Sequence, residues 1–94
     1  MFAVELSFTV DRVGVPPSTE TVEASVLRNG CGGRTRLEHL RVRRIAQAMF
    51  VVAFLAARTA GDASDFARRI GWQVSAELRH LQYIGQRVWT GDDF

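Results

Sequence analysis

The side chains that could take part in chemistry lie at alternating positions of three short segments. His39 could act as a base near neutral pH, and Glu5 and Arg87 could form an ion pair across neighbouring strands. No nucleophile, base and orienting group share a spacing typical of an active site, so no catalytic residue is predicted. The predicted binding residues are Glu5, Ser7, Thr9, His39, Arg41, Tyr83, Arg87 and Trp89.

The cysteine and histidine content argues against a metal centre or a disulfide. One cysteine and two histidines, far apart in sequence, match no spacing of metal ligands, and no cofactor is predicted. The single Cys31 lies in a glycine-rich loop, and its role stays open. A chain without disulfides is typical of a reducing compartment, and the longest apolar run is too short for a membrane span. We therefore expect a cytoplasmic protein.

Hydrophobic periodicity predicts six elements of secondary structure. The segment 2–10 alternates strictly between apolar and polar residues, which indicates a half-buried strand. Apolar residues recur every four positions after Asp62, which indicates an amphipathic helix. The full pattern predicts strands over 2–10, 35–44, 48–57 and 81–90, helices over 19–28 and 62–79, and a tail over 91–94. The whole chain, 1–94, is expected to form one domain.

The run from Ala48 to Ala57 contains no polar side chain and is the central element of this scheme. Its valine and phenylalanine content favours a strand. A long helix over 37–58 is the alternative, because the turn at 43–47 has no Gly, Pro, Asn or Asp, and because Leu, Ala, Arg and Gln favour helices. Such a helix would be apolar all round its second half, so a hairpin is preferred.

The order strand, helix, strand, strand, helix, strand resembles the ferredoxin-like split βαβ fold. That α+β resemblance implies a four-stranded antiparallel sheet in the order 4-1-3-2, with two helices on one face. It places the two most apolar strands in the centre of the sheet and the two arginine-bearing strands at its edges. Charged edge strands also discourage aggregation between sheets.

The fold leaves the other face of the sheet uncovered. If Phe50, Val52 and Phe54 pack on the helices, the alternate residues of the same strand form an apolar strip that points away from them. This interpretation predicts a homodimer interface made of Met49, Val51, Ala53 and Leu55.

Three functions follow from this scheme. The first is a non-enzymatic binding or accessory protein that forms a homodimer through the open sheet face. The second is a dimeric α/β barrel, either a small-molecule binder or a cofactor-independent enzyme, whose shared cavity is lined by the predicted binding residues.

The third function is nucleic-acid binding through the arginine-rich second strand. RNA-recognition domains stack bases on outward aromatic residues of their third strand. Alignment of that motif with the segment 47–54 puts Met49 and Val51 at the stacking positions and no basic residue at Gln47. The net charge of +2 is also small, so nucleic acid is ranked last.

Overall fold

The computed structural model describes residues 1–11, 15–31 and 33–89, so the predicted tail over 91–94 lies outside the described residues. The element order is the predicted one. The elements are β1 (Phe2–Val10), α1 (Thr19–Asn29), β2 (Arg36–Ile45), β3 (Ala48–Ala56), α2 (Ala60–Glu77) and β4 (Leu81–Trp89).

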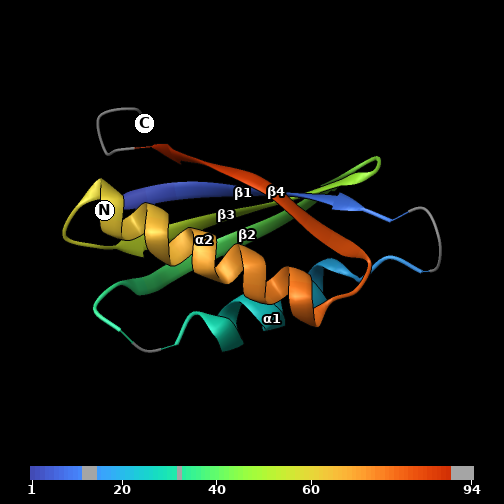
Figure 1. The fold of residues 1–94 in the computed structure, drawn as a ribbon, viewed down its shortest axis with the longest axis horizontal. Coiled ribbons are helices and arrows are strands. Elements are labelled where there is room, and N and C mark those ends of the chain that lie inside the picture. Colours follow the sequence, from blue (N-terminus) through green and yellow to red (C-terminus); the bar gives the residue numbers. More distant parts are fainter. Residues whose placement is uncertain (12–14, 32, 90–94) are drawn as a thin grey trace.

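The four strands form one antiparallel sheet in the order β2-β3-β1-β4, which is the predicted 4-1-3-2 order read from the other edge. Both helices lie against the same face of this sheet (Figure 1). The chain is therefore an α+β structure of two layers, and β3 and β1 are the central strands as expected.

The core lies between the sheet and the helices. From β1 it takes the predicted alternate side chains, among them Leu6 and Phe8, which are fully buried. From α2 it takes the stripe that includes Phe66, Ile70 and Val74, and α1 adds two valines. These contacts confirm the predicted inward faces of β1 and α2.

The predicted orientation of β3 was wrong by one residue. Met49, Val51, Ala53 and Leu55, expected on the open face, are buried against the helices. Every residue of β3 is apolar, so hydrophobicity alone does not distinguish its two faces. The register does, because each of these four residues lies opposite a core residue of β1 or a core-facing residue of β2. The alternate residues Phe50, Val52 and Phe54 are only partly buried and lie on the open face.

A β-bulge in β4 changes the orientation of two further residues. Ser7 of β1 pairs with Gly85 and Phe8 pairs with Tyr83, which leaves Ile84 without a partner in the sheet. Gly85 has a φ of 155°, which side-chain-bearing residues rarely adopt, so a glycine at this position allows the bulge. Because the bulge shifts the alternation, Tyr83, predicted to be a binding residue on the open face, is instead buried in the core, and Ile84 is 60% exposed.

A two-residue turn joins β2 to β3, so the alternative of a long helix over 37–58 is wrong. The turn consists of Ala46 and Gln47, and Ala46 has a φ of 52°. Hairpin turns of this length need a positive φ, normally supplied by Gly, Asn or Asp. Ala46 therefore holds a conformation that is unfavourable for an alanine.

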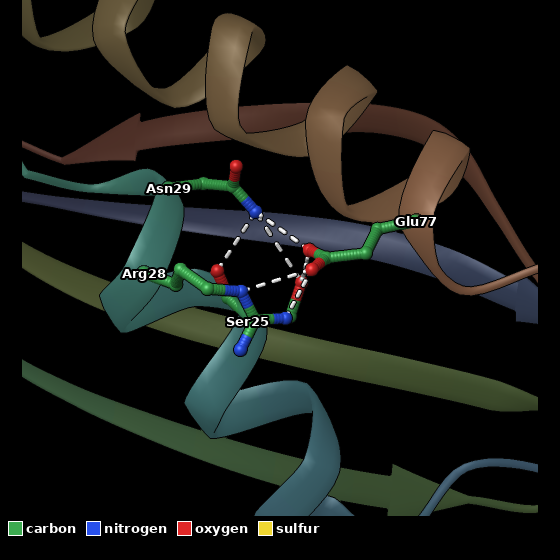
Figure 2. Close-up of polar contacts among 4 residues, drawn as sticks. All are labelled: Ser25, Arg28, Asn29 and Glu77. Atoms are coloured by element: carbon green, nitrogen blue, oxygen red, sulfur yellow. Dashed lines mark hydrogen bonds and ion pairs between the residues drawn. The ribbon is translucent and has the colours of Figure 1, made fainter.

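The two helices are joined by a polar cluster, which we call the helix clasp: Ser25, Arg28 and Asn29 of α1 and Glu77 of α2 (Figure 2). The buried Ser25 hydroxyl donates to Glu77 at 2.6 Å, and the Asn29 amide donates at 2.9 Å. Arg28 forms an ion pair with the same carboxylate. The hydrogen bond from Ser25, then those from Arg28 and Asn29, lower the pKa of Glu77 to about 2.

Each helix begins at a hydroxyl cap. The Ser18 hydroxyl accepts from the Thr21 amide at 3.1 Å and caps α1. The second helix begins earlier than expected, because the Thr59 hydroxyl accepts from the Asp62 amide at 3.0 Å. Asp62 therefore lies in the first turn, where its charge favours the positive end of the helix dipole.

Candidate functional site

The open face of the sheet is the surface that the two helices leave uncovered, and its side chains form rows across the strands. One row is His39, Phe54, Ala3 and Trp89, in the order of the strands. The next row is Arg41, Val52, Glu5 and Arg87, and the third is Arg43, Phe50, Ser7 and Gly85. The face is thus apolar along β3 and basic along both edge strands.

Aromatic rings are gathered in the first of these rows. The His39 and Phe54 rings lie with centroids 5.9 Å apart and planes tilted by 31°. At the opposite edge the Arg87 guanidinium lies 5.3 Å from the centroid of the Trp89 ring. Ala3 lies between Phe54 and Trp89 and is fully buried, so the two large rings flank a small residue. Together with Phe50, these rings can form flat apolar surfaces on the open face.

A shallow depression of about 240 Å³ lies on the same face, lined by Glu5, Arg41, Arg43, Phe50 and Val52. Within the described part of the chain, Arg41 and Arg43 form no ion pair shorter than 4.0 Å, and neither does Glu5. The depression therefore presents two guanidinium groups, one carboxylate and one aromatic ring to solvent.

Charge is divided between the two layers of the fold. The helices α1 and α2 together carry five carboxylates and three arginines, whereas the four strands carry two carboxylates and five arginines. The small net charge of the chain hides this separation. The sheet layer is basic, which favours an anionic partner over a cationic one.

Seven of the eight predicted binding residues share the open face: Glu5, Ser7, Thr9, His39, Arg41, Arg87 and Trp89. Tyr83 is the exception, because its ring packs on Phe8 in the core and its hydroxyl donates to Gln86 at 2.6 Å. Burial raises the pKa of Tyr83. Phe50 and Phe54 were not among the predicted binding residues. A two-residue turn between β2 and β3 would have indicated their outward orientation, because such a turn pairs Phe50 with Arg43 and Phe54 with His39.

The residues considered for metal or thiol chemistry do not form a second site. The exposed Cys31 thiol donates to the Leu27 carbonyl at 3.3 Å, a local contact with the preceding helix. Among the described residues no group of three histidine, cysteine or acidic side chains could hold a metal ion. The same part of the chain has no helix with the length and apolar character needed to cross a bilayer.

Comparison of the chain with protein-family models, with curated proteins and with solved structures finds no significant match. The side chains of the open face therefore have to indicate the function of this chain.

Proposed function

We propose that this chain is a binding module with a ferredoxin-like fold, and that its open face binds single-stranded nucleic acid. The observation that carries the proposal is the placement of Phe50, Phe54 and Trp89 on the sheet face opposite the two helices, with arginines on both edge strands. A nucleic acid is therefore preferred over a second copy of the chain as the partner that binds this face.

Two physical features of the face suit a single strand. Aromatic side chains stack on bases of any sequence, because every base has a π-face. Arg41, Arg43 and Arg87 lie beside these rings and can neutralise backbone phosphates. Stacking on the rings needs unpaired bases, so a duplex can make the phosphate contacts but not the stacking contacts.

The corrected orientation of β3 is what changes the ranking of nucleic acid. The sequence interpretation put Met49 and Val51 at the outward positions, where a base would find no aromatic ring. The outward residues are Phe50, Val52 and Phe54 instead. The outward positions of β1 are Ala3, Glu5, Ser7 and Thr9 and supply no ring, so the platform depends on β3 and the edge strands.

Fluorescence anisotropy with labelled DNA and RNA of about ten nucleotides tests this proposal, because binding sites of this kind span about 4–16 nucleotides. Single strands are expected to bind more tightly than the same sequence in a duplex. Phe50→Leu and Phe54→Leu remove a ring but keep an apolar side chain, and each is expected to weaken binding about tenfold, since stacking contributes about 1–3 kcal/mol per base.

The matched control is Trp72→Leu, which removes an aromatic ring that is 58% exposed on α2, in the helix layer. This variant is expected to bind like the unaltered protein. Equal losses in all three variants would contradict a site on the open face, and so would equal affinity for single and double strands.

Homodimerisation through the open face is the second candidate, and the distribution of residues over the strands favours it. The apolar residues lie on central β3, and the arginines lie on the edge strands β2 and β4. Interfaces between proteins commonly have an apolar centre and a charged rim. Against it, two identical faces would bring together the arginines of both edge strands, with only Glu5 and the Glu38 that pairs with Arg36 to oppose them on each copy.

Analytical ultracentrifugation at micromolar concentrations decides whether a dimer forms. A dimer that Phe54→Glu converts to a monomer, while Trp72→Glu does not, would support this candidate. Such a dimer would also be compatible with the α/β barrel, in which the depression beside Arg41 and Arg43 could hold a small anionic ligand. A monomer at all concentrations would eliminate both the dimer and the barrel.

A further inference from the structure

A second hollow lies at the end of the sheet where β2 begins and β3 ends. It has a volume of about 580 Å³ and is lined by Met1, Arg34, Arg36, Ala56, Ala57 and Arg58. The hairpin brings these residues together, because Arg36 lies opposite Ala56 in the register of β2 and β3. Arg58 is thereby placed beside two arginines that precede it by more than twenty residues.

The lining of this hollow carries three positive charges and no acidic residue. Within the described part of the chain, Arg34 and Arg58 form no ion pair shorter than 4.0 Å. Arg36 lies 3.1 Å from Glu38, but both side chains are exposed, so the pair is weak. Three guanidinium groups around one hollow repel one another, and an anion bound between them would remove that repulsion.

The chemistry of the lining favours one kind of anion. Arginine binds phosphate through two parallel hydrogen bonds, and a phosphate offers several oxygens and up to two charges to three such groups. The residues that line the hollow include alanine and methionine and no acidic residue, and the Glu38 carboxylate that pairs with Arg36 is not part of the lining. A ligand with a single carboxylate has only two oxygens to share among the three guanidinium groups, fewer than a phosphate.

We infer that the hollow formed by Arg34, Arg36 and Arg58 is a phosphate-binding site. A free phosphate ester and a nucleic-acid backbone both carry this group, and only the second source rests on the proposed function. Arg36 is one row beyond His39 and Phe54 on the open face. A strand stacked on these rings would reach the hollow along β2 and β3.

Pyrophosphate is the probe for the site alone. In an NMR titration of labelled protein at low salt, shifts are expected for the amides and guanidinium groups of Arg34, Arg36 and Arg58. Arg34→Gln and Arg58→Gln should each weaken pyrophosphate binding about tenfold. Arg79→Gln is the matched control, since Arg79 is exposed and lies in the turn between α2 and β4. Equal shifts at Arg79, or equal affinity for a dicarboxylate such as glutarate, would overturn the inference.

An oligonucleotide titration separates this site from the proposed function. The double variant Arg34→Gln, Arg58→Gln should reduce the slope of log K against log salt by about 1.4, because each phosphate contact to a single strand contributes about 0.7. Phe50→Leu should leave that slope unchanged. If pyrophosphate binds but no oligonucleotide does, the phosphate site stands and the proposed function fails. If oligonucleotides bind with an unaltered slope in the double variant and pyrophosphate causes no shifts, the phosphate site fails alone.

Discussion

Substitution of Gly71 by alanine tests the packing that determines which residues of β4 face the core. A Cβ atom at Gly71 would lie 2.6 Å from Cδ1 and Cε1 of the Tyr83 ring and 2.9 Å from its Cζ. Ordinary contact begins near 3.4 Å, so the ring would have to move by about 0.8 Å. It has little freedom to move, because Phe8 and Trp72 pack on it at centroid distances of 5.6 and 5.2 Å.

The expected loss of stability is the balance of two costs and one gain. Overpacking of this kind costs about 1–3 kcal/mol, and a displaced ring also weakens the hydrogen bond from its hydroxyl to Gln86, which is worth about 1 kcal/mol. Alanine is favoured over glycine inside a helix by about 1 kcal/mol, which offsets part of this. We expect Gly71→Ala to lose about 2 kcal/mol of unfolding free energy, or roughly 10 °C in Tm for a domain of this size.

Thermal and urea unfolding followed by circular dichroism measure this change, and Gly61→Ala is the matched control. Gly61 lies in the same helix, and its added Cβ would meet only the Thr59 hydroxyl at 3.7 Å, an ordinary contact. We expect the control to gain about 0.5–1 kcal/mol. Equal stabilisation by both substitutions would show that Tyr83 does not pack on Gly71, and the inward orientation of Tyr83 on β4 would be wrong.

Three further predictions concern the turn, the helix clasp and the core. Ala46→Gly should raise the unfolding free energy by up to about 1 kcal/mol, measured by urea unfolding, because glycine adopts a positive φ without strain; a loss would contradict the turn geometry. Glu77 has a folded-state pKa of about 2 against 4.5 for the unfolded chain, so its contribution is present above pH 4.5 and is lost as the pH falls toward 2. Glu77→Gln should remove the change in unfolding free energy between pH 4.5 and pH 2. In Ser25→Ala, an NMR titration of the carboxyl groups should find the pKa of Glu77 raised toward 4.5. An unshifted pKa would mean that Ser25 does not donate a hydrogen bond to Glu77. Ile70→Ala should lose about 2–5 kcal/mol in the same unfolding assay, since its side chain is 1% exposed in the core, and a loss below about 1 kcal/mol would place it outside.

The order of the elements and of the strands could be predicted because the sequence patterns differ sharply between segments. Alternation in β1 and the four-residue repeat in α2 each correspond to one face of one element. The orientation of β3 could not be read in this way, because both of its faces are apolar. It depends on the turn at Ala46 and Gln47, which lacks the usual turn residues and gave no signal of its length.

Most members of the candidate site, Trp89 included, were predicted, whereas Phe50 and Phe54 were missed for the same reason. Glu5 and Arg41 lie on strands with one charged face, so their orientation followed from their neighbours. Phe50 and Phe54 depended on the orientation of β3. Tyr83 was misplaced because one bulge residue reverses the alternation along β4, and glycine at position 85 indicates a bulge without fixing which residue is extra.

The most direct test of the open face as a single-strand binding surface is the fluorescence of Trp89. The chain has two tryptophans, so Trp72→Phe leaves Trp89 as the sole reporter and keeps an aromatic ring against Tyr83. Addition of a ten-nucleotide single strand at low salt should quench Trp89 emission in a saturable way, and added salt should reverse the quenching. Emission that stays unchanged while anisotropy reports saturated binding would place the nucleic acid elsewhere, and absence of binding by either method would contradict the proposed function.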